Sequence, residues 1–298
     1  MMEELNIPAV TSYLMRILSY DSTEEAMTWL EEQKNRIQGD SAGLKLFTAF
    51  SQASRYFKKD LNQLSNADLE DADKLVAGFR PDKWNRLQTA RTYLMLHFEA
   101  KDAAHFVKTL DRLLGSADMY EQEAIYAALP ILPYQESLTL RAAEGLRTNI
   151  TSVFDAIALN NPYPAKYLDE LAWNQMVIKA FFLQRPIYQI QQSDARANAS
   201  LTKILVDYAH ERWAAGREVM PEIWRFVGPF LTEEHLKDVQ KVILEGNTLE
   251  KEAALLACSH STLPAAQKLL QAHPEVKAGI EKAELSWESI GKRYADQA

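Results

Sequence analysis

Cysteine is almost absent from this sequence, because Cys258 is the only one. A single cysteine cannot form an internal disulfide, and it cannot supply the several thiolates of a cysteine-based metal cluster. It lies in the apolar run Ala253 to Cys258, where a small buried thiol is the ordinary interpretation and a nucleophile is the alternative. We therefore expect a buried structural thiol, no disulfide and no metal.

Glycine is also scarce, and the ten glycines of the chain are widely spaced. None of them falls in the G-x-G or P-loop spacing that lets backbone N–H groups surround a phosphate. The sequence therefore offers no loop of the kind that binds nucleotides, and we expect no cofactor.

A long uninterrupted apolar run is missing as well. The longest apolar stretch, residues 168–183, is interrupted by polar side chains and is too short and too polar to span a bilayer; they are Asp169, Glu170, Asn174, Gln175 and Lys179. Residues 1–10 carry Glu3 and Glu4 where a secretory signal has positive charge, and no small-residue cleavage site follows. We therefore expect a soluble cytoplasmic protein with no direct membrane span.

The sequence also lacks clusters of basic residues. The formal net charge is −8, and lysines and arginines alternate with acidic residues along the chain. Such a distribution gives no electrostatic footprint for a phosphate backbone, so we expect no nucleic-acid partner. The hydrophobic share of 47% and the charged share of 25% are those of a folded protein.

Apolar residues recur with the period of an α-helix along almost the whole sequence, as at Ile7, Val10, Leu14, Ile17 and Leu18. Strand-like alternation is nearly absent. Helix starts are also marked, since Ser22 with Glu25 and Asn247 with Glu250 have the cap-plus-acid spacing that satisfies free backbone N–H groups. The sequence therefore predicts an all-α fold with little or no strand.

Glycine and proline break this pattern into a dozen or more short segments, which favours antiparallel helical neighbours. We expect an irregular α-solenoid of stacked, HEAT-like helical hairpins, with a compact helical bundle as the alternative. No linker or low-complexity segment divides the chain, so we expect a single elongated domain over residues 1–298. Pro130 and Pro133 forbid a continuous helix, which makes residues 130–134 a possible soft boundary.

An unusual segment runs from Asn161 to Phe182, where two prolines precede a predicted long helix. On one continuous helix, Tyr167, Leu171, Asn174 and Ile178 would share a stripe, with Asn174 as its polar member. A buried amide needs a hydrogen-bond partner. Asn174 could bridge a neighbouring loop within the core, or its amide could contact a ligand.

A second unusual segment runs from Leu205 to Arg217. Asp207 and His210 are three residues apart, so on a helix they share a face and could form a carboxylate–imidazole pair. Such a pair could be structural, could bind a ligand or could act as a general base. No serine or cysteine is tied to His210 by spacing, so the sequence supplies no nucleophile for it.

Other site patterns are incomplete. Asp207 and His210 form one variant copy of the Glu-x-x-His motif, whereas a di-metal bundle needs two. His97 and His105 are more typical of surface or core positions than of metal ligands. The acidic run after Ser65 has the wrong spacing for magnesium diphosphate and is typical of a solvated, capped helix start; it comprises Asp68, Glu70, Asp71 and Asp73.

The two unusual segments resemble the EboA family. The resemblance rests on the Asn-Pro-Tyr-Pro motif from Asn161, the Tyr-Leu-Asp-Glu-Leu-Ala-Trp-Asn-Gln helix from Tyr167, and the Asp-Tyr-Ala-His-Glu-Arg-Trp-Ala-Ala-Gly-Arg helix end from Asp207. It extends from residue 161 through Glu218 to Phe230 and is loose before residue 130. It implies a helical protein, encoded with a prenyltransferase-like membrane protein and several enzyme-like partners, that takes part in moving a secondary-metabolite precursor out of the cytoplasm. It implies no catalytic residue.

Aromatic residues crowd into the same region, where they suit either a core or a groove for a flat aromatic or prenylated metabolite. We expect the two segments to lie side by side and to form one cleft lined by Tyr163, Tyr167, Asn174, Asp207, His210 and Trp213. The favoured function is a binding or scaffold protein that works with the proteins of its gene cluster. The alternative is an all-α enzyme with a site around Asp207 and His210 that acts on an aromatic or prenylated metabolite.

Overall fold

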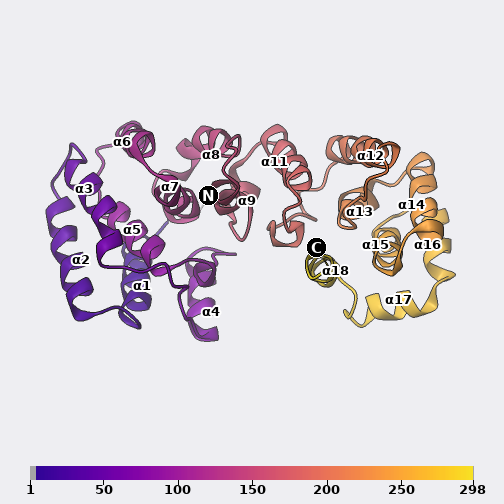
Figure 1. Cartoon of the computed structure of the whole chain (residues 1–298), viewed down its shortest axis with the longest axis horizontal. Coiled ribbons are helices and arrows are strands. Elements are labelled where there is room, and N and C mark those ends of the chain that lie inside the picture. Colours follow the sequence, from indigo (N-terminus) through magenta and orange to yellow (C-terminus); the bar gives the residue numbers. More distant parts are fainter. Residues whose placement is uncertain (1–4, 298) are drawn as a thin grey trace. The chain divides into compact units, whose positions relative to one another are not determined.

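The computed structural model describes residues 5–297, and these residues form eighteen α-helices joined by turns and short 3-10 segments (Figure 1). Within the described range there is no strand, and one isolated bridge pairs Leu61 with Asn85. The prediction of an all-α fold is confirmed. Contacts divide the chain into two compact units, the first ending at Asp169 and the second beginning at Glu170, and each is described by itself.

The first unit is built from ten α-helices: α1 (Ile7–Ser19), α2 (Glu24–Ile37), α3 (Leu44–Gln52), α4 (Asn66–Leu75), α5 (Arg86–Leu96), α6 (Ala103–Ser116), α7 (Met119–Ala127), α8 (Thr139–Gly145), α9 (Thr151–Ala158) and α10 (Tyr163–Tyr167). Its 3-10 segments are η1 (Ala53–Arg55), η2 (Pro81–Lys83), η3 (Leu129–Ile131) and η4 (Gln135–Leu138). Pro130 lies within η3 and Pro133 just after it, so the suggested soft boundary falls inside this unit.

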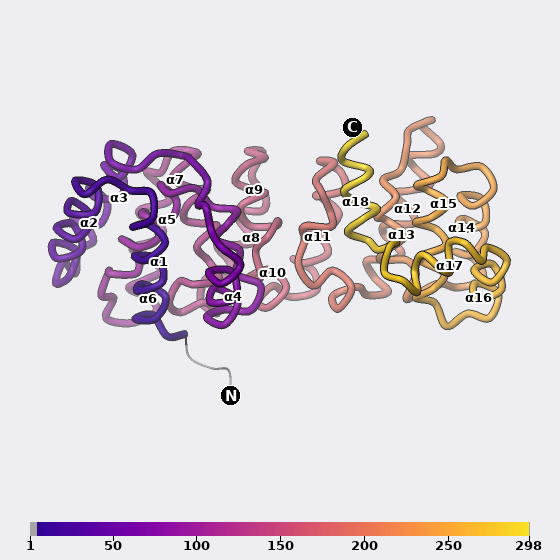
Figure 2. Tube along the Cα trace, turned by 90° about the horizontal axis from the view of Figure 1, so that it is seen from below, coloured from indigo at the N-terminus to yellow at the C-terminus, as the bar shows by residue number. Residues whose placement is uncertain are grey.

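Helix α5 is the centre of the first unit. It packs against α1, α2, α3 and α7, and every residue from Thr89 to Leu96 is buried (Figures 1 and 2). Even Arg91, which is 3% exposed, points inward, where it donates to the Phe50 carbonyl at 3.1 Å and to a carboxylate oxygen of Glu121 at 3.2 Å. A buried guanidinium is tolerated only when such partners are present.

The second unit contains α11 (Glu170–Phe182), α12 (Ala199–Ala214), α13 (Ile223–Val227), α14 (Glu233–Glu245), α15 (Thr248–Ser259), α16 (Pro264–Gln271), α17 (Pro274–Glu281) and α18 (Trp287–Ala295), with 3-10 segments η5 (Ile187–Gln189) and η6 (Gly228–Phe230). Helix α15 is its centre and contacts α13, α14, α16, α17 and α18 (Figures 1 and 2). Cys258 lies on α15 and is fully buried, and burial raises the pKa of its thiol to about 12. The expected inert structural thiol agrees with this position.

Helix starts follow the local chemistry of the sequence with one difference. The predicted Asn247–Glu250 capping box begins α15, whereas α2 is capped by Thr23 rather than Ser22, because the Thr23 hydroxyl accepts the Ala26 N–H. Sequential helices such as α14, α15 and α16 pack together as hairpins do, but α1 and α7 reach α5 across intervening chain. The stacked-hairpin arrangement therefore stays a prediction.

Candidate functional site

The first unusual segment forms two helices instead of one. Helix α10 ends at Tyr167, the extended backbone of Leu168 follows, and α11 begins at Glu170. The predicted stripe of Tyr167, Leu171, Asn174 and Ile178 on one helix is therefore wrong. Asn174 is 5% exposed while Leu171 is 67% exposed, so these two side chains point to different sides of α11.

Tyr163 and Tyr167 both bind Gln135. The Tyr163 hydroxyl donates to the Gln135 carbonyl at 2.7 Å, and the Tyr167 hydroxyl donates to its side-chain Oε1 at 2.6 Å. The two rings lie 4.8 Å apart, and Tyr163 is fully buried. Gln135 in turn donates to the Pro130 carbonyl. The hydrogen bonds of these two tyrosines thus hold α10 against the segment around Pro130.

Asn161, the first residue of the Asn-Pro-Tyr-Pro motif, also forms structural hydrogen bonds. Its side-chain Nδ2 donates to the carbonyls of Tyr126 at 3.3 Å and Ala156 at 2.9 Å, and its Oδ1 accepts the Tyr163 N–H at 2.9 Å. The residue is 4% exposed. The motif therefore positions α10 against α7 and α9 through one buried amide.

Asn174 is paired with Asn198. Each side-chain Nδ2 donates to the other residue's Oδ1, at 3.2 and 2.8 Å, and Asn198 Oδ1 also accepts the Leu201 N–H as the cap of α12. Of the two interpretations of Asn174 left open by the sequence, the structure shows the bridge within the core. This amide joins α11 to the start of α12.

His210 pairs with Asp238 of α14 instead of Asp207. Its Nε2 lies 2.9 Å from Asp238 Oδ1, on a side chain that is 51% exposed, and Asp207 is also exposed. The expected carboxylate–imidazole pair exists, but its carboxylate comes from a different helix. Sequence spacing along α12 could not reveal this partner.

Trp213 lies beside His210 in a layered group of side chains. Its ring is 5.8 Å from the His210 ring and 6.1 Å from the ring of Trp224, on which it stacks, and the Lys241 ammonium lies 4.4 Å from its centre. Trp224 is buried, so Trp213 connects the core to the surface shared by α12 and α14. The cation and the indole stabilise each other by a cation–π interaction.

The structure does not bring Asn174 and His210 together. Asn174 contacts Asn198 at the start of α12, and His210 lies twelve residues further along this helix. At the helical rise of 1.5 Å per residue, these positions are about 18 Å apart along the axis. Tyr163 and Tyr167 belong to the first unit and the other four predicted residues to the second. This separation does not favour one small ligand held by both Asn174 and His210, and the binding role of the six predicted residues stays a prediction.

Helix α11 instead presents an exposed apolar face. Its inner side chains are buried, namely Trp173, Met176, Val177, Ala180 and Phe181. Leu171, Ile178 and Phe182, at i, i+7 and i+11, lie on the other side, and we call them the outer face of α11. Leu171 is 67% and Phe182 74% exposed, while Ile178 is half-buried. A helix that is apolar on both sides normally has both sides covered.

Glu222 is a functional candidate that the sequence interpretation missed. It is 1% exposed, lies at the start of α13, and accepts the backbone N–H groups of Ile187 and Tyr188. Burial raises the pKa of its carboxyl to about 8, although nearby Arg225 and the two N–H groups act against the shift. A lone acid inside the otherwise apolar run Val219 to Trp224 is the signal that the sequence offers.

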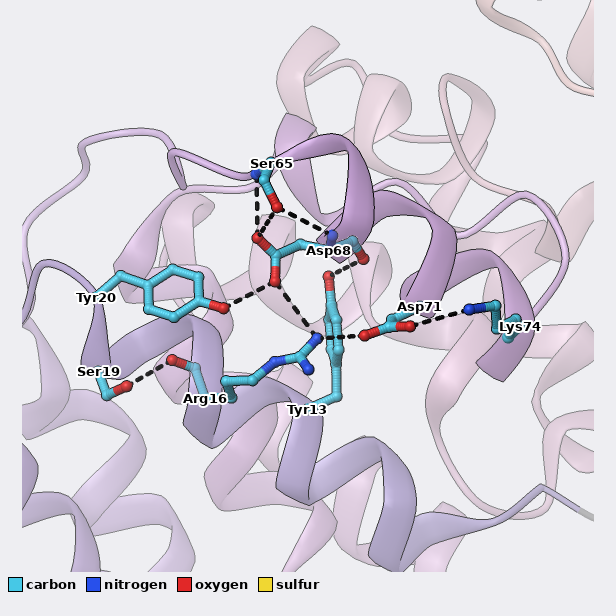
Figure 3. A network of polar contacts seen from close by, with 8 residues as sticks. All are labelled: Tyr13, Arg16, Ser19, Tyr20, Ser65, Asp68, Asp71 and Lys74. Carbon is cyan, nitrogen blue, oxygen red and sulfur yellow. Dashed lines mark hydrogen bonds and ion pairs between the residues drawn. The ribbon is translucent and has the colours of Figure 1, made fainter.

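The acidic run after Ser65 is a structural junction between α1 and α4 (Figure 3). Asp68 accepts hydrogen bonds from Ser65 and from the Tyr20 hydroxyl at 2.8 Å, and Arg16 lies 3.4 Å from it and 2.8 Å from Asp71. Burial acts to raise the pKa of Asp68, but these partners hold it below its usual range. The expected cap is present, whereas the expectation of a solvated run is wrong for Asp68, which is only 7% exposed.

The described residues offer neither a metal cluster nor a membrane-spanning helix. Among residues 5–297, no group of three or more histidine, cysteine, aspartate or glutamate side chains is placed to hold a metal ion. No helix in the same range combines the length and the apolar character that crossing a membrane requires. His97 ends α5, while His105 lies in α6 and contacts the Ser41 carbonyl at 2.9 Å, so the two histidines are on different helices.

Comparison with known proteins agrees with the resemblance of the two segments. The family model described as metabolite traffic protein EboA matches residues 10–228, which include most of the first unit as well as α11, α12 and α13. The match thus reaches much further toward the N-terminus than the resemblance seen in the sequence. No curated protein and no solved structure matches the chain. Because the family model covers well over half of the chain, the protein belongs to the EboA family of metabolite traffic proteins.

Proposed function

We propose that this protein works in metabolite traffic as a binding or scaffold protein, and that the outer face of α11 contacts a partner protein encoded in the same gene cluster. The observation that carries this proposal is the exposure of Leu171 and Phe182 on a helix inside the matched residues. Large exposed apolar side chains grouped on one surface are typical of interaction sites.

The size of the outer face suits a protein partner. Residues 171 and 182 are about 16 Å apart along the helix axis at 1.5 Å per residue, which is a length that one helix of a partner can cover. Covering Leu171, Ile178 and Phe182 would remove apolar surface from water, which favours association by roughly 25 cal/mol per Å² before the entropic cost of binding.

A partner protein fits this face better than a lipid surface does. The chain has a net charge of −8, and an anionic membrane surface attracts basic segments and repels acidic proteins. The polar residues of the matched segments have a different role, because Asn161, Tyr163 and Asn174 hold the helices in place. A rigid support with an exposed apolar helix is what a scaffold requires.

Co-purification tests the proposed function. The full-length chain carries an affinity tag, is expressed with the proteins of its neighbouring genes, and the captured proteins are identified by mass spectrometry. We expect one of these gene products to be enriched at a defined stoichiometry. Capture of none of them, together with a light-scattering mass that shows a dimer, would assign the outer face to a second copy and reject a partner protein.

A further inference from the structure

The carboxyl of Glu222 is unusually isolated for a buried group. The two backbone N–H groups of Ile187 and Tyr188 bind it, yet its Oε1 has no hydrogen-bond partner. Leaving a buried charged oxygen without a partner destabilises a fold, so a buried carboxyl in this state favours its neutral form. Burial therefore favours the protonated form of Glu222 where it lies.

Helix α18 lies directly on this carboxyl at Gly291. A Cβ atom added at position 291 would lie 2.8 Å from Cδ and 2.9 Å from Oε1 of Glu222, and 2.4 Å from Cδ1 of Tyr188. Real Cβ atoms do not make contacts this short, so a glycine is required for α18 to sit this close. The backbone of α18 therefore closes the space above Glu222.

The attachment of α18 is limited to a few side chains. Trp287 and Ile290 are buried, and Arg293 pairs with Glu252 at 2.5 Å. The family match ends at residue 228, so α18 lies outside it. A helix of nine residues that is held mainly by two buried side chains and one ion pair can open while the rest of a unit stays folded.

The charged groups around Glu222 do not neutralise it. Arg225 of α13 acts on the carboxyl electrostatically, but its guanidinium is bound by Asp194 through two hydrogen bonds of 2.6 and 2.8 Å. Tyr188 of η5 faces the carboxyl, and on α18 Lys292 pairs with Glu288 at 2.6 Å. His260, at the end of α15, stacks on Trp287 and lies near Asp194. None of these groups supplies an unshared positive charge to the carboxyl.

We propose that α18 is a proton-sensitive lid: it closes over the neutral carboxyl of Glu222 and opens when that carboxyl releases its proton to solvent. Opening exposes the carboxylate together with the Ile187 and Tyr188 N–H groups on η5.

The direction of the pH effect follows from the two environments. With the lid closed, burial raises the pKa of Glu222 to about 8, whereas in water a glutamate has an ordinary value of 4.5. The closed state therefore binds the proton more tightly than the open state does. The free energy by which this proton stabilises the closed state is fully present below pH 4.5 and is lost as the pH rises to about 8. Within this window the ratio of open to closed lid rises up to about tenfold per pH unit.

Hydrogen–deuterium exchange of the full-length chain tests the lid. Exchange is measured at pH 5.5 and 7.5 and corrected for the intrinsic pH dependence of amide exchange, in the wild type and in Glu222→Gln. We expect the protection of residues 287–295 to fall by about 100-fold over these two pH units in the wild type and by less than about threefold in Glu222→Gln. Glu288→Gln, which changes an exposed carboxyl of the same helix, should keep the wild-type response.

Two results would overturn the proposal. One is unchanged protection of α18 between the two pH values in the wild type. The other is an equal fall in Glu222→Gln, which would assign the response to another group such as His260. If Glu222→Gln does not fold, Gly291→Ala replaces it: we expect low protection of α18 at both pH values while α15 stays protected, and full protection of α18 in this variant would also reject the lid.

Discussion

The side-chain amides of Asn174 and Asn198 donate to each other across the contact between α11 and the start of α12, with donor–acceptor distances of 3.2 and 2.8 Å. Asn198 also caps α12 by accepting the Leu201 N–H. This pair therefore fixes the orientation of α11 relative to α12. Asn174 lies on the buried side of α11, whereas Leu171 lies on its outer face.

Replacing Asn174 by alanine should destabilise the protein. The change removes the buried amide of Asn174 and leaves the part-buried amide of Asn198 without one of its partners, and such a loss costs about 1 to 3 kcal/mol of unfolding free energy. Urea unfolding measures it, with Gln175→Ala on the exposed side of α11 as the control, for which we expect a change below about 0.5 kcal/mol. Equal effects of the two substitutions would show that the amide pair contributes nothing specific.

Trp173→Ala should be more damaging, because Trp173 is fully buried on the inner side of α11. Removing its ring leaves a cavity, and we expect a loss of about 3 to 5 kcal/mol in unfolding free energy. Thermal and urea unfolding measure this loss. The control is Leu171→Ala, because the side chain of Leu171 is 67% exposed. A loss below about 1 kcal/mol for Trp173→Ala would contradict its role as a buried anchor.

Gly291→Ala should destabilise the protein, although replacing a helical glycine by alanine usually stabilises a helix. Alanine normally stabilises a helix by up to about 1 kcal/mol relative to glycine, and we expect a gain in that direction for Gly279→Ala in α17, where the added Cβ meets only Leu285 at 3.7 Å. At position 291 the same atom meets Tyr188 at 2.4 Å, so overpacking should cost about 1 to 3 kcal/mol. A melting temperature of Gly291→Ala at or above that of the wild type would contradict the close approach of α18.

His210→Ala should change stability little. The pair with Asp238 is half exposed, and exposed ion pairs typically contribute between 0 and about 1 kcal/mol. The role of His210 in binding remains a prediction, and the melting temperature and the affinity for the captured partner measured on one variant decide it. A normal affinity with a clearly lowered melting temperature would leave His210 with a structural role alone.

The helical class could be predicted from the sequence because the apolar period and the caps are local signals. Two side-chain pairs could not be predicted in this way, namely Asn174 with Asn198 and His210 with Asp238. In each pair the two residues lie more than 20 residues apart in the sequence, and no local spacing rule connects them. The sequence gives no sign of the break between α10 and α11, because neither Leu168 nor Asp169 is a proline or a glycine. The break is visible only in the structure, where the backbone of Leu168 is extended. Without that break, Leu171 was expected on the same face as Asn174.

Glu222 shows a second limit of sequence interpretation. An acid among apolar residues can point outward or be buried, and only the packing of α18 at Gly291 decides between these outcomes. The exposed outer face of α11 is a related case, since an apolar residue on a helix is ordinarily expected to be covered. In both cases the feature on which a proposal rests is one that departs from the local rule.

The affinity of the captured partner for variants of the outer face of α11 tests the central claim most directly. The double variant Leu171→Glu, Phe182→Glu is compared by isothermal titration with the wild type and with Leu244→Glu, a leucine of α14 that is 78% exposed and lies outside the matched residues. We expect the double variant to bind at least about 100-fold more weakly, a loss of about 2.7 kcal/mol, with an unchanged melting temperature, and Leu244→Glu to bind as the wild type does. Equal affinity of the wild type and the double variant would contradict the account.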